Sequence, residues 1–141
     1  MPSEVDKLKL DDVLTWSGGR LLNRAQESFN FIGTDSRVNL KDKLFIPLRG
    51  DLFDGHMFIK AAIENGCGGI IFDKKSNPSV VIEPNSHVTC IEVNDTLQAL
   101  QNIAQGYRRK LNKTILAITG SAGKTTTKEF THQILSKIKK T

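Results

Sequence analysis

The sequence ILAITGSAGKTTTKEF, residues 115–130, indicates which class of fold to expect. An apolar run breaks at Gly120, passes through small residues and meets Gly-Lys-Thr at 123–125. A strand, a glycine turn and a helix N-terminus direct backbone N–H groups at one point, where an anion can bind. The stretch therefore predicts a strand over 114–119, a phosphate-binding loop, and a helix from about 125 to 139.

The residues after this turn suit a nucleoside triphosphate. Lys124 offers a mobile positive charge to the outer phosphates, and the Thr125 hydroxyl can hold Mg²⁺. The strict Walker A spacing, G-x-x-x-x-G-K-[ST], would require glycine at position 118, where this chain has Ile118. The alternative interpretation is an ordinary glycine-rich turn with a chance lysine, but strand, glycines, Gly-Lys-Thr and helix all favour the phosphate loop.

Strands and helices alternate upstream of this loop, which predicts an α/β fold with mostly parallel pairing. Asp54 and Asp95 are suited to cap two of the helices. Pro47 indicates an edge or bulge position for its strand. We expect strands at 29–33, 44–48, 68–73, 79–83 and 88–93, and helices at 11–17, 54–66 and 95–112. The apolar face of the last of these helices should be formed by Leu97, Leu100, Ala104, Tyr107 and Leu111.

Two units follow from this pattern. A polar stretch around Asn112 separates residues 1–112, which look like a complete module, from residues 113–141. One strand and one helix cannot bury both faces of a sheet, because buried parallel strands need neighbours and helical cover. We therefore expect the second unit to be the beginning of a larger domain.

Composition excludes several classes of protein. The 141 residues are 38% apolar and 25% charged with a net charge of +5, which is typical of a folded domain. No apolar run is long enough to cross a membrane, and the first residues lack the apolar segment of a signal peptide, so we expect a cytoplasmic protein. The basic run YRRKLNK (107–113) has no interleaved aromatic residues, so an anionic small molecule is a better partner than nucleic acid. Cys67 and Cys90 are expected to be buried, reduced thiols.

Two stretches resemble the Mur ligases of peptidoglycan synthesis. AITGSAGKTTTKE (117–129) is similar to their ATP-binding loop, which has the same shortened spacing. Residues 34–73, from TDSRVNLKDK to GGIIFD, resemble their N-terminal, UDP-binding domain. The version FDGHMFI (53–59) is most similar to the members that add D-alanyl-D-alanine, and less similar to those that form the tripeptide. The resemblance covers about residues 31–138.

The resemblance implies an ATP- and Mg²⁺-dependent ligase. In this family ATP phosphorylates the terminal carboxylate of UDP-N-acetylmuramoyl-tripeptide, and the amine of D-Ala-D-Ala attacks the acyl phosphate. The nucleotide loop would consist of Gly120, Ser121, Ala122, Gly123, Lys124, Thr125 and Thr126. Lys124 and Thr125 would be catalytic, and Thr125 would be the Mg²⁺ ligand. The UDP-substrate would be bound by Thr34, Asp35, Ser36, Arg37, Asp54, Gly55 and His56.

Alternatives remain open for these residues and for the chain. Thr34, Asp35 and Ser36 are residue types that favour turns, so they could be present for that reason alone. Asp54 is explained by helix capping alone. A complete Mur ligase has three domains, whereas this chain matches the first and the beginning of the second, so we expect the chain alone to be inactive. The other hypotheses are a fragment of a tripeptide-forming ligase, a stand-alone UDP-sugar-binding module, and a small P-loop NTPase.

Overall fold

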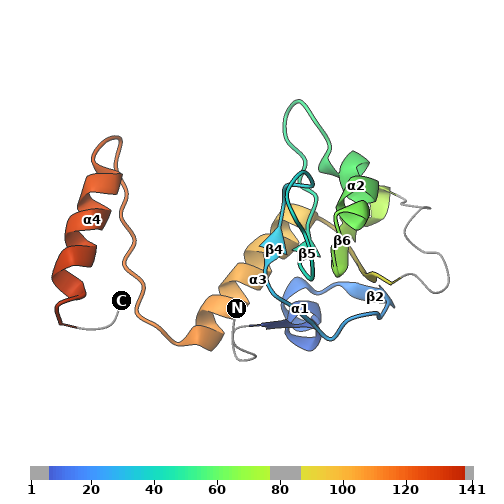
Figure 1. Cartoon of the computed structure of the whole chain (residues 1–141), viewed down its shortest axis with the longest axis horizontal. Coiled ribbons are helices and arrows are strands. Elements are labelled where there is room, and N and C mark those ends of the chain that lie inside the picture. The colour runs from blue at the N-terminus through green and yellow to red at the C-terminus, as the bar shows by residue number, and fades with distance from the viewer. Residues whose placement is uncertain (1–6, 77–86, 139–141) are drawn as a thin grey trace. The chain divides into compact units, whose positions relative to one another are not determined.

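The computed structural model describes residues 7–76 and 87–138 (Figure 1). The chain divides into two compact units, Met1–Leu111 and Asn112–Thr141. This division lies one residue before the boundary expected from the sequence. No helix within the described ranges has the length and apolar character needed to cross a membrane.

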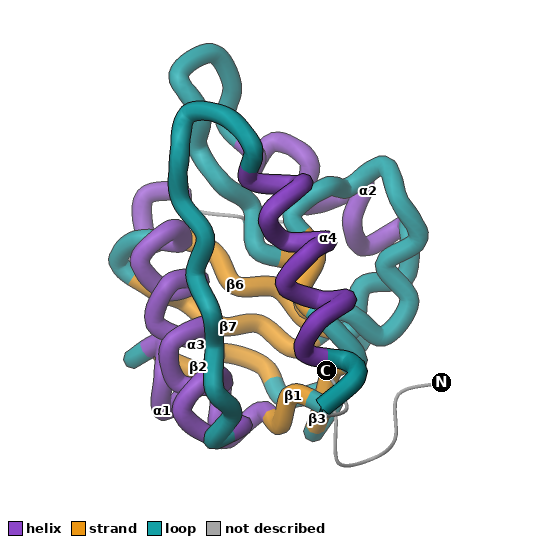
Figure 2. The backbone as a smooth tube through the Cα atoms, turned by 90° about the vertical axis from the view of Figure 1, so that its left-hand side faces the viewer, coloured by secondary structure: helices purple, strands orange, loops and turns teal. Residues whose placement is uncertain are grey.

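A five-stranded sheet forms the centre of the first unit (Figure 2). Its order is β2-β7-β6-β5-β4, in which β4 to β7 run parallel and β2 is antiparallel to β7. The pairing confirms the α/β class with mostly parallel strands. The strands are β2 Arg20–Asn23, β4 Ile32–Gly33, β5 Leu44–Phe45, β6 Gly69–Asp73 and β7 Thr89–Val93, and a separate pair joins β1 Leu8–Lys9 to β3 Ser28–Phe29.

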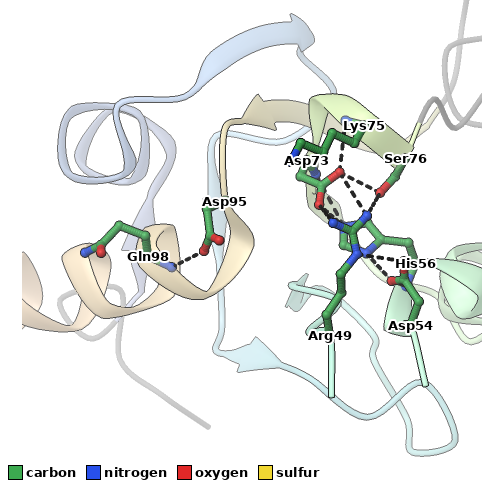
Figure 3. A network of polar contacts seen from close by, with 8 residues as sticks. All are labelled: Arg49, Asp54, His56, Asp73, Lys75, Ser76, Asp95 and Gln98. Atoms are coloured by element: carbon green, nitrogen blue, oxygen red, sulfur yellow. Dashed lines mark hydrogen bonds and ion pairs between the residues drawn. The ribbon is translucent and has the colours of Figure 1, made fainter. Parts of the chain in front are cut away.

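The helices lie where the sequence indicates, but two are shorter than expected: the region 54–66 is a 3₁₀ turn followed by a short α-helix, and the last helix ends at Leu135. α1 (Leu10–Ser17) ends at Gly18, whose φ of +65° favours glycine. Asp95 caps α3 (Thr96–Leu111) by accepting the Gln98 N–H at 2.7 Å, as predicted (Figure 3). The remaining helices are a 3₁₀ turn at Gly55–Phe58 that leads into α2 (Ile59–Glu64), a second 3₁₀ turn at Lys74–Ser76, and α4 (Lys124–Leu135).

Two apolar clusters cover the opposite faces of the sheet. Ile71 of β6 belongs to the cluster that includes residues of α1 and α3, while Ile70 and Phe72 belong to the cluster that includes residues of α2. All five residues of β6 are buried, as expected for a central parallel strand. Cys67 and Cys90 are both buried, as predicted, and burial raises the pKa of the Cys67 thiol to about 12 and that of the Cys90 thiol to about 11.

Several expected elements of the first unit differ from the structure. The strand expected at 29–33 is divided between β3 and β4, because the Asn30 N–H donates to the Asp42 carbonyl instead of continuing one ladder. β5 ends at Phe45 and has a neighbour on each side, so Pro47 follows the strand and occupies no edge position. Leu97 and Leu111 are exposed, and the buried side of α3 is centred on Ala99 and Ile103.

Two other predicted strands are not seen. The strand expected at 79–83 lies outside the described residues. Residues 114–119 form no strand, because a strand needs a hydrogen-bonded neighbour and residues 112–138 contain none. The second unit therefore consists of an extended segment, the glycine loop and α4.

The contact between α1 and α3 provides a stability test. A Cβ added to Gly106 would lie 2.3 Å from the ring of Trp16, so Gly106→Val should force the helices apart and lower the free energy of unfolding by about 1–3 kcal/mol. Gln105→Val places the same side chain on an exposed position of α3. This substitution should change the free energy of unfolding by less than about 1 kcal/mol. Urea unfolding of both variants measures the difference, and equal stabilities would contradict this packing.

Candidate ligand-binding sites

A hollow of about 390 Å³ opens beyond the carboxyl ends of β4 and β5. Thr34 directly follows β4, and Phe45 is the last residue of β5. In parallel α/β sheets, ligands bind in the crevice outside the carboxyl ends of the strands. The structure thus brings two predicted segments together here, since the lining consists of Thr34, Asp35, Ser36, Arg37, Phe45, Phe53, Gly55 and Phe58.

The turn at 34–37 is held by its own side chains. Asp35 Oδ1 accepts the Arg37 backbone N–H at 2.9 Å, and its two oxygens accept Arg37 Nε at 2.9 Å and Nη2 at 2.8 Å. These hydrogen bonds from Arg37 lower the pKa of Asp35 to about 2. Ser36 is buried, and its carbonyl accepts a 2.7 Å hydrogen bond from Asn65. The Arg37 side chain is nevertheless 87% exposed, and exposed ion pairs contribute little free energy. Arg37 can therefore replace its ion pair with Asp35 by one with a bound anion.

Aromatic side chains also line the hollow. Phe45 is buried, whereas Phe53 and Phe58 are 61% and 46% exposed. Partly exposed phenylalanine rings beside a polar turn can stack on a flat ring such as a nucleobase. The hollow therefore joins an apolar wall to a turn rich in hydrogen-bonding groups.

Asp54 and His56 belong to the same segment as Phe53 and Phe58 but do not line the hollow. Asp54 Oδ1 accepts the His56 backbone N–H at 3.0 Å, which caps the 3₁₀ turn, and lies 2.6 Å from His56 Nδ1 (Figure 3). The Asp73 N–H donates to His56 Nε2 at 3.3 Å, so the ring proton lies on Nδ1. Both ring nitrogens are thus engaged, and the His56 side chain is only 5% exposed.

Gly55 is required by a close approach of two backbones. Its N–H donates to the Leu48 carbonyl at 2.9 Å, and a Cβ at this position would lie 2.6 Å from that oxygen. Among the three residues at 54–56, only Gly55 reaches the hollow, while its two neighbours support the segment.

This network is completed by three residues that were not predicted from the sequence: Arg49, Asp73 and Ser76 (Figure 3). Arg49 Nε donates to Asp54 at 2.8 Å, and Arg49 Nη1 lies 2.8 Å from the Asp73 carboxylate. The Ser76 hydroxyl donates to Asp73 at 2.7 Å. The available signal was Asp73 itself, since a carboxylate at the end of a fully apolar strand needs a partner when buried.

The second candidate site is the glycine loop before α4. Gly123, with φ of +76°, is the N-cap of this helix, and the first helical turn carries no acidic residue. The Lys124 ammonium donates to the Gly120 carbonyl and so closes the loop. A hollow of about 290 Å³ is lined by Leu116, Ile118, Lys124, Thr125 and Lys128. The remaining predicted loop residues, Ser121, Ala122 and Thr126, are exposed.

The described residues offer little for a metal ion on their own. Within 7–76 and 87–138, no three His, Cys, Asp or Glu side chains gather in a way that could hold one. Mg²⁺ at nucleotide sites is usually held by one or two protein groups together with phosphates and water. The Thr125 hydroxyl at the start of α4 fits such a limited role.

Comparisons with known proteins agree on one family. Residues 28–108 match the model described as "Mur ligase family, catalytic domain". The chain is 41% identical over 104 residues to the UDP-N-acetylmuramoyl-tripeptide–D-alanyl-D-alanine ligase of Bacillus subtilis. That match covers 74% of this chain and 22% of the relative.

Solved structures give the same result. A MurF crystal structure from Acinetobacter baumannii superimposes with a TM-score of 0.77 at 28% identity, covering 93% of this chain and 28% of that one. MurF from Thermotoga maritima in complex with ADP gives a TM-score of 0.58 at 30% identity, covering 75% and 23%. The chain thus spans about a quarter of the length of these relatives.

The polar network predicts a dependence of stability on pH. Burial raises the pKa of Asp54, but hydrogen bonds from Arg49 and His56 outweigh burial and hold that pKa below its usual range. The ionised carboxylate therefore stabilises the fold above the unfolded pKa of about 3.9, and this contribution is lost as the pH falls further. Urea unfolding between about pH 6 and about pH 3 should show a shallower loss of stability for Asp54→Asn than for the unaltered chain.

The matched control is Asp51→Asn, which removes an exposed carboxylate from the same loop. Its pH dependence should follow that of the unaltered chain. An equally steep loss of stability in Asp54→Asn would show that the network does not depend on this carboxylate.

Proposed function

Because this chain belongs to the Mur ligase family, we propose that it supplies part of an ATP-dependent ligase that joins D-alanyl-D-alanine to UDP-N-acetylmuramoyl-tripeptide. Residues 1–112 would bind the UDP end of the precursor, and residues 113–141 would begin the ATP-binding domain. The observation that carries this proposal is the hollow in which the turn at 34–37 meets Gly55 and two partly exposed aromatic rings. The identity of the Bacillus subtilis relative supports the choice of substrates.

We propose that the hollow at 34–37 binds the uridine diphosphate. Phe53 and Phe58 offer faces for the uracil ring, because base–aromatic stacking needs only an accessible π surface. Arg37 and the polar groups of Thr34 and Ser36 would receive the diphosphate, since guanidinium groups match phosphate oxygens in charge and geometry. Asp54 and His56 would act indirectly by holding the segment that carries the rings.

The loop from Gly120 to Thr126 would bind the phosphates of ATP. Amides at the start of α4, a first turn without acidic residues and the Lys124 ammonium all favour an anion there. A phosphate would displace the Gly120 carbonyl as the partner of Lys124. The bound ADP in the Thermotoga maritima relative supports a nucleotide site in this family.

The reaction brings several negative charges together. Transfer of a phosphoryl group to a carboxylate needs positive charge around the γ-phosphate, which Lys124 would supply. Mg²⁺, held in part by the Thr125 hydroxyl, would neutralise the outer phosphates when bound. The acyl phosphate would then be attacked by the amine of D-Ala-D-Ala, at groups contributed by the rest of the enzyme. A cytoplasmic location, where ATP is available, agrees with Cys67 and Cys90, neither of which is part of a disulfide.

Binding of UDP-N-acetylmuramoyl-tripeptide tests the first site. Calorimetric titration of the chain should show binding without ATP, and Arg37→Gln should raise the Kd at least about tenfold because a charge-assisted hydrogen bond to phosphate is lost. Arg24→Gln removes a similar exposed arginine, paired with Glu27 and Asp11, and should leave the Kd unchanged. Binding of Arg37→Gln at the affinity of the unaltered chain would argue against a diphosphate at this turn.

A lysine substitution tests the second site in a full-length ligase that contains these residues. Lys124→Ala should lower the ligation rate at least about 10²-fold, because the transferring phosphoryl group loses its positive partner. Binding of the UDP-substrate should remain close to normal, because residues 34–37 belong to the other compact unit. Lys137→Ala, an exposed lysine beyond the loop, serves as the control. Parallel loss of ligation and UDP-substrate binding would rule out two separate sites.

A further inference from the structure

The polar network around Arg49 contributes no side chain to the lining of the first hollow, although Phe53, Gly55 and Phe58 of the adjoining segment line it. We propose that Arg49 is a positioning residue for the ligand of that hollow: its guanidinium ties segment 50–58 to the end of β6 and so fixes the aromatic wall (Figure 3). This inference rests on the proposed uridine diphosphate site. It assigns a role to a residue that lies outside the predicted binding motifs.

The guanidinium of Arg49 reaches three acceptors in different directions. Nε donates to Asp54 Oδ2 at 2.8 Å, and Nη1 lies 2.8 Å from Asp73 Oδ2. Nη2 donates to the Ser76 hydroxyl at 3.1 Å. One planar group therefore joins the loop that carries Asp54 to the strand and 3₁₀ turn that carry the other two acceptors.

The contact with Asp73 fixes one end of this connection. The Asp73 side chain is only 5% exposed, and it also accepts the Lys75 N–H at 3.0 Å and the Ser76 hydroxyl at 2.7 Å. A buried carboxylate needs a cation as well as hydrogen bonds, so Arg49 is held firmly on this side. Asp73 is the last residue of a fully buried strand, which makes it a rigid anchor.

The contact with Asp54 connects this anchor to the segment that bears the two aromatic rings of the hollow, Phe53 and Phe58. Arg49 and Asp54 form an isolated β-bridge, and inside it the Gly50 N–H donates to the Phe53 carbonyl at 2.9 Å. The Phe53 ring lies against Gly50, where an added Cβ would be 3.0 Å from Cε1. On its other side, Asp54 caps the 3₁₀ turn that ends at Phe58. Both wall rings thus belong to elements that Asp54 holds.

Positioning matters here because the wall is exposed. Leu52 at the tip of the loop is 98% exposed, and Phe53 is 61% exposed, so burial alone does not order this segment. A ligand that binds a loosely held wall must order its side chains, and this ordering cost lowers the affinity. Because Arg49 already holds this segment in place in the unliganded chain, binding of the ligand requires less additional ordering.

Arginine is required by the geometry. A lysine ammonium can compensate the charge of Asp73 but, as a single point, cannot also reach Asp54 and Ser76 along separate directions. Arg49→Lys should therefore keep the buried carboxylate paired while releasing the loop. This variant separates positioning from a general contribution to stability.

Titration with uridine 5′-diphosphate, together with amide hydrogen exchange of the full chain, tests the inference. Arg49→Lys should remain folded, with normal protection of β6 and β7, faster exchange at 50–58, and a Kd for uridine diphosphate raised at least about fivefold. Arg49→Gln should show the same changes with an additional loss of overall stability. Arg20→Lys, which alters the exposed pair with Glu92, should change neither the exchange at 50–58 nor the Kd.

The possible outcomes separate this inference from the proposed function. Unchanged uridine diphosphate affinity in a folded Arg49→Lys chain would overturn the positioning role and leave the proposed function intact. If the unaltered chain does not bind uridine diphosphate at all, the proposed site fails and this inference fails with it. An equal loss of uridine diphosphate affinity in Arg20→Lys would also overturn the positioning role, because the raised Kd would then not be specific to Arg49.

Discussion

A parallel strand that is buried on both faces needs a hydrogen-bonded neighbour on each side, and this constraint governs the whole chain. β6 satisfies it completely, with β5 and β7 as neighbours and an apolar cluster on either face. The parallel strands end at a common edge, where the turn after β4 and the loop after β5 meet. The hollow and the polar network beside it are consequences of that shared edge.

The same constraint explains the second unit. Residues 114–119 have the composition of a buried strand, yet among residues 112–138 they have no strand to pair with, and Ile115 and Leu116 are exposed. Phe130 and Ile134 of α4 are exposed as well. The glycine loop nevertheless keeps its local features, because a left-handed Gly123 and the start of a helix depend on residues close in sequence.

Local signals in the sequence were sufficient for much of the fold. The caps at Asp54 and Asp95 and the buried strand expected at 68–73, which is β6 at 69–73, were predicted because each depends on a short pattern. The division of 29–33 between two sheets and the buried side of α3 were missed, because distant partners decide them. The network centred on Arg49 was missed for the same reason, since Asp73 is 24 residues away from it in sequence.

We propose that the hollow beside residues 34–37 holds the uridine diphosphate of the precursor. The most direct test is to map backbone amide NMR shifts of the chain while UDP-N-acetylmuramoyl-tripeptide is added. We expect the largest shifts at 34–37 and 53–58. Shifts concentrated at the Gly120–Thr126 loop, or at the separate apolar hollow lined in part by Phe31, Ile103 and Tyr107, would contradict it.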